Sequence, residues 1–294
     1  MTSLPLWRSM LFVPATADRL VAKAHTRGAD AQIVDLEDAV APSQKPRARE
    51  VLSDVVDHVG QDGAEVLVRI NRPLRLAIPD LEAAVIPGVT ALMLPKAENA
   101  AHVRLLSEVI SELESERSIP DGRTQLITLI ETPEGLRNAP EIAACPRVVG
   151  ITLGTEDFAD ALGMPEPDSE ELIPYMKTLQ LAAREAGVLA LGYPGSIANF
   201  TDLELFRSDV RRARAQGFDG GSCIHPAQVP ILNEEFAPSS DEIAKAERIV
   251  TAYDEALASG TGAIELDGKM IDVPVANRAR RLLARHRLIS QREA

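Results

Sequence analysis

Short apolar runs recur along the chain and alternate with segments whose apolar residues return every three or four positions. Eight such runs begin about 30 residues apart, which is the length of one strand and its following helix in a parallel sheet. The runs are Ser9–Pro14, Ala31–Asp38, Glu65–Asn71, Ala91–Lys96, Gln125–Thr132, Val148–Asp157, Leu189–Gly195 and Gly221–Pro226. No two of them are joined by a hairpin-length turn, so the pattern predicts parallel strands.

The segments between the runs have the spacing of amphipathic helices. We expect helices at Asp18–Gly28, Lys45–Val59, Glu98–Arg117 and Asp202–Gln216. Near-continuously apolar strands that are covered by such helices indicate a parallel sheet buried on both faces. Eight units of this kind predict an α/β fold, a closed (β/α)8 TIM barrel, with an open doubly wound sheet as the alternative.

The pattern changes after the eighth run. We expect a helix at Asp241–Ala258, an extended segment at Ala263–Asp272 and a last helix from Pro274 to about Arg287. A complete barrel needs none of these elements. The chain is therefore expected to form a barrel domain at residues 1–235 and a C-terminal extension at residues 236–294, which would pack on a neighbouring subunit or on the barrel flank.

Composition narrows the possible partners. Acidic residues outnumber basic ones by 44 to 31, which gives a formal charge of −13 and disfavours nucleic acid and anionic membranes as partners. Cys145 and Cys223 are too few for a disulfide framework, and no apolar run is long enough for a membrane span. The low cysteine count favours a protein of the reducing cytoplasm.

Charged residues within the predicted strands lie almost entirely at the carboxyl ends, which share one face of a barrel. They are Asp35, Glu37, Asp38, Arg69, Lys96, Glu131, Glu156, Asp157 and His225. Glu131 and Asp157 end consecutive runs, and carboxylates at neighbouring strand tips can share one Mg²⁺ ion. Arg69 could hold a substrate carboxylate with its planar set of donors.

Each of these assignments has a structural alternative. Glu131 and Asp157 could cap the following helices or pair with loop arginines, and Arg69 could form an ion pair with the acidic residues that end the second run. His225 lacks a nucleophile or base partner in the sequence, so we favour a histidine that simply bonds to its neighbours.

Several motifs, taken in order, resemble one known family. RSMLFVPA, DLEDAV, VRIN, MLPKAE, LIETPEG, GTEDFA, CIHPAQ and DGKMIDVPV resemble the citrate lyase beta-subunit-like branch of the HpcH/HpaI aldolase/citrate lyase family. The resemblance covers nearly the whole chain. It implies a Mg²⁺-dependent carbon–carbon lyase that cleaves or forms a 3-hydroxyacyl-CoA, such as malyl-, citramalyl- or citryl-CoA, from an acyl-CoA and a 2-oxo acid.

The resemblance also implies roles for single residues. It assigns Glu131 and Asp157 to Mg²⁺ and Arg69 to the 2-oxo acid. It assigns Glu37 and Asp38 to the orientation of metal-bound water. Asp272 matches an acid that family members project into a neighbouring subunit's site, which implies a homo-oligomer, a trimer or hexamer. Lys96 and Pro14 are further expected substrate contacts.

Other activities are compatible with the same residues. A malyl-CoA thioesterase, a CoA-independent 2-oxo acid aldolase and a non-catalytic subunit of a larger lyase complex are the alternatives. The sequence departs from the family pattern at Gly221, where a lysine is common. If that lysine contacts the nucleotide of coenzyme A, this chain lacks the contact.

Overall fold

The protein is described by a computed structural model that covers residues 4–293. It contains two compact units, the first ending at Phe236 and the second beginning at Ala237.

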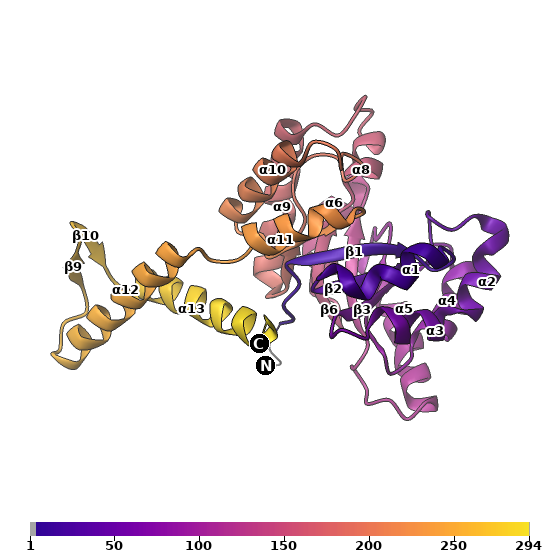
Figure 1. Ribbon diagram of the computed structural model, residues 1–294, viewed down its shortest axis with the longest axis horizontal. Coiled ribbons are helices and arrows are strands. Elements are labelled where there is room, and N and C mark those ends of the chain that lie inside the picture. Colours follow the sequence, from indigo (N-terminus) through magenta and orange to yellow (C-terminus); the bar gives the residue numbers. More distant parts are fainter. Residues whose placement is uncertain (1–3, 294) are drawn as a thin grey trace. The chain divides into compact units, whose positions relative to one another are not determined.

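The first unit is built on one eight-stranded sheet in which every paired strand is parallel (Figure 1). Its spatial order is β7-β6-β5-β4-β3-β2-β1-β8. The strands are β1 (Ser9–Pro14), β2 (Ala31–Asp35), β3 (Glu65–Arg69), β4 (Val89–Leu94), β5 (Gln125–Ile130), β6 (Val148–Leu153), β7 (Leu189–Leu191) and β8 (Gly221–Cys223).

The sheet almost closes on itself between its first and last members. The amide of Gly192 donates to the carbonyl of Gly220 at 2.8 Å, and the amide of Asp219 donates to the carbonyl of Ala190 at 2.8 Å. These bonds join the end of β7 to the segment before β8. The predicted (β/α)8 barrel is confirmed, and the open sheet is excluded because a strand order that returns to its start leaves no switch point.

Helices surround the sheet, as the sequence spacing predicts. They are α1 (Asp18–Ala24), α2 (Lys45–Glu50), α3 (Leu52–Val59), α4 (Leu74–Ala84), α5 (Ala100–Glu116), α6 (Pro133–Arg137), α7 (Ala139–Ala143), α8 (Thr155–Ala161), α9 (Ser169–Ala186), α10 (Leu203–Gln216) and α11 (Val229–Glu235). The single helix expected at Lys45–Val59 is two helices that divide at Val51, for which the sequence offers no breaker.

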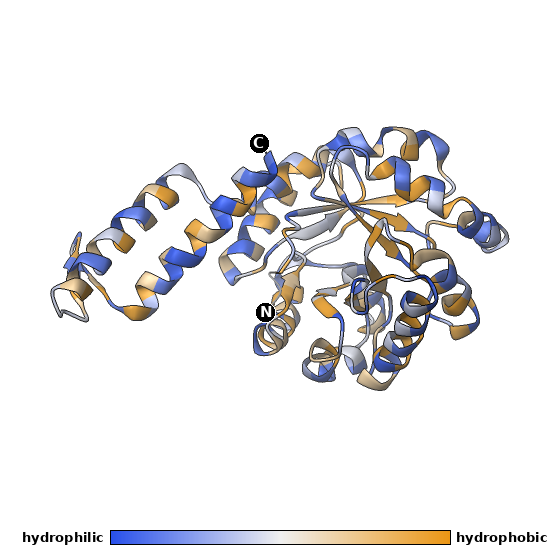
Figure 2. Ribbon diagram, turned by 90° about the horizontal axis from the view of Figure 1, so that it is seen from below, coloured by the Kyte–Doolittle hydropathy of each residue, from blue (hydrophilic) through white to orange (hydrophobic). Residues whose placement is uncertain are grey.

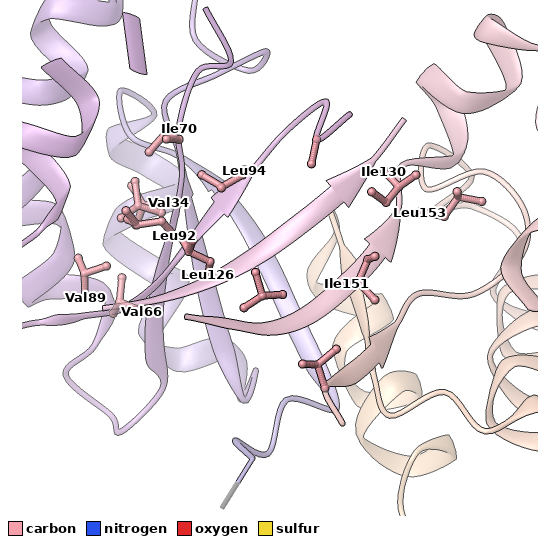
Figure 3. Close-up of a cluster of buried hydrophobic side chains, with 14 of the residues drawn as sticks. Val34, Val66, Ile70, Val89, Leu92, Leu94, Leu126, Ile130, Ile151 and Leu153 are labelled. Carbon is pink, nitrogen blue, oxygen red and sulfur yellow. The ribbon is translucent and has the colours of Figure 1, made fainter. Parts of the chain in front are cut away.

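Alternate strand residues enter two different apolar layers. Ile33, Leu67 and Met93 belong to a cluster inside the barrel, whereas Val34 and Leu92 pack in the larger cluster between the strands and the helices (Figure 3). Hydrophobic positions are accordingly concentrated along the strands (Figure 2). Because side chains alternate along a strand, this register also decides which residues beyond the core face the barrel axis.

The strands end earlier than expected, and this corrects the placement of several site residues. Glu37, Lys96 and Glu131 lie in loops just after their strands, and Asp157 lies in the first turn of α8. The strands stop where polar side chains begin to accept backbone hydrogen bonds, as Asp35 does from the amides of Glu37 and Ala39.

The second unit is a pair of helices with a short hairpin between them. It contains α12 (Ser240–Ala258), β9 (Ile264–Leu266), β10 (Lys269–Ile271) and α13 (Val273–Glu293). The extended segment predicted at Ala263–Asp272 is therefore an antiparallel hairpin. Asp267 and Gly268 both have positive φ, as a type I′ turn requires, and Asp-Gly is the sequence signal for that turn. Within the part of the chain described, no helix is long and apolar enough to span a membrane.

The outer apolar layer supplies a stability prediction. Leu92 on β4 is fully buried, so Leu92→Ala should cost about 2–5 kcal/mol of unfolding free energy through lost burial and a residual cavity. The matched control is Leu181→Ala on α9, where the side chain is 67% exposed and the expected cost is within about 0.5 kcal/mol. Chemical denaturation of both variants measures the difference. Equal losses would contradict the assigned core.

Candidate active site

A cavity of about 240 Å³ lies at the carboxyl ends of the strands. This is the face on which parallel barrels place their ligands. Its wall combines apolar and acidic side chains with one cation among the described residues. The lining residues are Phe12, Asp38, Arg69, Leu129, Glu131, Thr152, Leu153, Gly154, Thr155, Glu156, Asp157, Gly192, Tyr193, Ile197 and Ser222.

Arg69 is held by two acidic residues of the neighbouring strand end. Its Nε and Nη2 atoms donate to Asp35 Oδ1 and Oδ2 at 2.8 and 2.6 Å, and its Nη1 lies 3.0 Å from Glu37 Oε2. The guanidinium carbon also stands 4.9 Å from the centre of the Phe12 ring. Arg69 therefore makes the ion pair that we gave as its structural alternative, and it still lines the cavity.

Glu131 and Asp157 both contact one residue, Lys96. The Lys96 amide donates to Glu131 Oε2 at 2.6 Å, and its Nζ lies 3.2 Å from Asp157 Oδ1. Lys96 has a φ of 50°, in the left-handed region that few residues other than glycine adopt. Such strain concentrates at functional sites.

Gly154 leaves room for the Glu131 side chain. A Cβ atom at this position would lie 2.5 Å from Glu131 Cγ, which no side chain could tolerate without displacing the carboxylate. The requirement explains the glycine of the GTEDF segment between β6 and α8. The sequence pattern by itself gave no reason for it.

Burial raises the pKa of two carboxyl groups at the site. Burial raises the pKa of Glu131 to about 8, and the Asp157 and Glu37 carboxylates add to this effect while the Lys96 amide opposes it. Burial also raises the pKa of Glu37 to about 7, although Arg69 opposes the shift. Burial alone would lower the pKa of Lys96, but its bond to Asp157 produces a net rise.

The donor set at the cavity fits Mg²⁺ better than a softer metal. Four carboxylates line the cavity (Asp38, Glu131, Glu156 and Asp157), and Arg69 is the single lining cation in the part of the chain described. No cluster of three or more histidine, cysteine or acidic residues at positions 4–293 is arranged to enclose a metal. Mg²⁺ is typically held by one or two carboxylates, with substrate and water oxygens completing the octahedron. Glu131 and Asp157 are the residues that would hold it.

The remaining predicted site residues are dispersed. Asp38 lines the cavity and is exposed, whereas Pro14 ends β1 and is not among the lining residues. Asp272 lies in the second unit, where its Oδ1 accepts the Val275 amide at 3.3 Å and caps α13. His225 caps a short 3₁₀ turn through a bond from the Ala227 amide, in agreement with the reading that we favoured.

Several residues that line the cavity were not predicted from the sequence. Phe12, Thr152 and Ser222 lie on strands, and Tyr193 and Ile197 lie in the segment that follows β7. Phe12 could have been predicted from the alternation of side chains along β1, because Phe12 follows the inward-facing Met10 by two positions. The segment after β7 carries no comparable periodicity.

Position 221 faces the outer layer of the barrel. A Cβ atom there would lie 2.9 Å from Tyr193 Cδ1 and 3.5 Å from a methyl carbon of Leu232 on α11. A side chain at this position would therefore meet the packing between β8 and the surrounding helix. Where family members often have a lysine, this chain has Gly221, and the Tyr193 ring packs against that glycine.

Comparisons with known proteins cover nearly the whole chain. Citrate lyase subunit beta from Leuconostoc mesenteroides subsp. cremoris is 36% identical over 284 residues, which are 95% of this chain and 92% of the relative. A (3S)-malyl-CoA thioesterase from Cereibacter sphaeroides is 35% identical over 286 residues, which are 97% of this chain and 96% of the relative.

A solved structure shares the fold and most of the sequence length. It is the protein CitE from Mycobacterium tuberculosis in complex with magnesium, acetoacetate and coenzyme A, with a TM-score of 0.74 and 33% identity. The match covers 97% of this chain and 99% of that one. Residues 8–226 also match the family described as HpcH/HpaI aldolase/citrate lyase. The chain belongs to the HpcH/HpaI aldolase/citrate lyase family.

Proposed function

We propose that the protein is a Mg²⁺-dependent lyase that cleaves, or forms, the carbon–carbon bond of a 3-hydroxyacyl-CoA. The products of cleavage are an acyl-CoA and a 2-oxo acid. The observation that carries the proposal is that Glu131 and Asp157, which both contact Lys96, line one cavity together with Arg69. An acidic site with a single lining guanidinium suits an anionic substrate only if a cation balances the carboxylates.

The related proteins support this chemistry. The solved relative is in complex with magnesium, acetoacetate and coenzyme A, so that protein binds an oxo acid and the coenzyme. Another solved structure of the Mycobacterium tuberculosis citrate lyase beta subunit contains oxaloacetate and magnesium. By analogy, we assign a 2-oxo acid and an acyl-CoA as the small molecules that this chain binds.

The reaction moves one proton and one electron pair. The substrate hydroxyl gives its proton to a water molecule while the adjacent carbon–carbon bond breaks, and the hydroxyl carbon becomes the carbonyl carbon of the 2-oxo acid. The bonding pair passes to the thioester fragment as an enolate, which becomes an acyl-CoA when its carbon is protonated. When bound, Mg²⁺ would offset the negative charge that develops on the substrate oxygen, an effect worth several kcal/mol.

Arg69 would bind and orient the 2-oxo acid end of the substrate. Its bonds to Asp35 fix the plane of the guanidinium, so its remaining N–H groups are directed before substrate arrives. We also assign Glu37, which lies 3.0 Å from Arg69, and Asp38, which lines the cavity, to the orientation of metal-bound water.

Asp272 is the proposed proton donor to the enolate carbon. This role comes from the family resemblance and requires a tail contributed by a second subunit, which implies a homo-oligomer such as a trimer or hexamer. In the same proposal, residues 1–235 form the catalytic domain and residues 236–294 the extension that supplies the acid.

Thioester hydrolysis is the second candidate function. It is favoured by the malyl-CoA thioesterase relative, which matches 97% of this chain at 35% identity, close to the 36% of the citrate lyase relative. The same cavity would then direct water to the thioester carbonyl. Lyase and thioesterase activity differ in their products, so one assay separates them.

The test of function uses the isolated full chain with Mg²⁺ and malyl-, citramalyl- and citryl-CoA in turn. A lyase releases a 2-oxo acid and no free thiol, whereas a thioesterase releases coenzyme A as a thiol. We expect 2-oxo acid formation that chelation of Mg²⁺ abolishes. Turnover of free hydroxy acids alone would instead indicate a CoA-independent aldolase, and inactivity on all substrates would favour a subunit of a larger complex.

Glu131 should make folding stability depend on pH when Mg²⁺ is absent. Its pKa rises from 4.5 to about 8 on folding, so the native state binds the extra proton between these values and its stability falls as pH rises through that window. Glu131→Gln has no carboxyl group to titrate, so it should not show this fall in stability as pH rises. We therefore expect Glu131→Gln to have a higher Tm than wild type at pH 8, and Mg²⁺ to stabilise wild type but not this variant.

Glu134→Gln is the matched control for that measurement. It removes the same charge from an exposed position at the start of α6. In thermal unfolding at pH 5 and pH 8, with and without Mg²⁺, the Tm of this control should respond to pH and Mg²⁺ as that of wild type does. A Glu131→Gln variant that gains stability from Mg²⁺ as wild type does would exclude Glu131 as a ligand.

Subunit mixing tests the shared site. Asp272→Asn and Arg69→Ala should each reduce turnover by at least about 100-fold, which is the effect of removing one proton donor or one positioned cation. If Asp272 acts on a neighbouring subunit, mixed oligomers contain some sites with both native residues and regain activity after subunit exchange. Exchange demonstrated by mass spectrometry without any regain would refute the shared site.

A further inference from the structure

Lys45 uses all three of its ammonium hydrogens outside the cavity. Nζ donates to the carbonyl of Leu36 at 3.0 Å, to the carbonyl of Glu37 at 2.8 Å and to Asn71 Oδ1 at 2.6 Å. Lys45 begins α2, whereas its acceptors lie just after β2 and β3. One side chain therefore ties a helix start to two strand ends.

Asn71 and Asp80 complete this network. Asn71 Nδ2 donates to the Leu36 carbonyl at 2.9 Å and to Asp80 Oδ2 at 2.7 Å. The fully buried Asp80 also accepts from Arg49 Nε at 2.6 Å. Because buried polar groups are costly without partners, a fully satisfied network of this kind keeps one conformation.

The network fixes the backbone of Glu37 from one side, and Asp35 fixes it from the other. The Glu37 amide donates to Asp35 Oδ1 at 2.9 Å, while its carbonyl accepts from Lys45. The Glu37 carboxylate is thereby held 3.0 Å from Arg69 Nη1, and the next residue, Asp38, reaches the cavity. Lys45 itself is not among the residues that line the cavity.

We propose that Lys45 is a positioning residue, which acts by holding the Leu36–Asp38 segment so that Glu37 and Asp38 face Arg69 and the cavity. The inference rests on the lyase or thioesterase function proposed above. Arg69 keeps its two bonds to Asp35 without Lys45, so binding of the 2-oxo acid should survive while the chemical step suffers. A split between KM and kcat distinguishes this role from general support of the fold.

The test compares Lys45→Met with a control at the opposite end of the barrel. Methionine keeps the length and apolar stem of lysine but donates no hydrogen bonds. Arg147→Met is the control, because Arg147 binds Glu114 and the Thr124 carbonyl just before β5 begins. Both variants lose a network of similar size, but only one network touches the Glu37 segment.

Lys45→Met should lower kcat about 10- to 100-fold, the effect of a displacement near 1 Å at a reacting centre, with KM changed by less than about threefold. Arg147→Met should lower Tm while kcat stays within about twofold of wild type. Hydrogen–deuterium exchange should speed up at residues 35–40 in Lys45→Met alone. Unchanged exchange there, or an unchanged kcat in Lys45→Met, would overturn the proposal.

Rescue and a wild-type reference complete the experiment. Lys45→Cys treated with an aminoethylating reagent regains an ammonium on a side chain of nearly lysine length, and kcat should recover. Cys145 and Cys223 are both buried, and wild type treated in the same way controls for their modification. A wild type that turns over no thioester would refute the proposed function, and the exchange measurement would still decide the role of Lys45.

Discussion

The buried carboxylate of Asp35 is the constraint on which the site depends. It is 1% exposed and accepts two bonds from Arg69 and one each from the amides of Glu37 and Ala39. A charge in such a position is tolerated only with complete hydrogen bonding and an opposite charge. Asp35 therefore sets both the plane of the Arg69 guanidinium and the path of the chain that carries Glu37 and Asp38.

The part of the site around Glu131 and Asp157 differs from the Asp35–Arg69 pair, because its two carboxyl groups share one ammonium group, that of Lys96. Glu131 is buried and accepts the Lys96 amide, whereas the Lys96 ammonium makes its ion pair with Asp157. Burial raises the pKa of Glu131, and the neighbouring Asp157 and Glu37 carboxylates raise it further. The site thus combines the Arg69–Asp35 ion pair with a group of carboxyl oxygens that suits a hard divalent ion.

Much of this arrangement follows from one property of the strands. Ile33 lies inside the barrel, and Asp35 follows it by two residues on the same side; Leu67 and Arg69 repeat the relation, as do Leu129 and Glu131. When a charged residue follows an inward-facing apolar residue by two positions, the sequence predicts that both side chains face the barrel axis. The charged side chains then lie at the carboxyl end of the barrel, next to its apolar interior. The same reasoning fails for Asp157, because α8 begins at Thr155 and helical geometry replaces the alternation of the strand.

The sequence by itself determined the barrel, the family and the face on which Arg69, Glu131 and Asp157 gather, because periodicity and strand direction are local properties of the chain. Only the tertiary structure decided that Lys96 adopts a positive φ, that Gly154 makes room for Glu131, and that Lys45 binds Asn71 beyond the end of β3. These features depend on contacts between residues that are distant in sequence. Local patterns carry no record of such contacts, since they arise only when the closed sheet brings separate strand ends together.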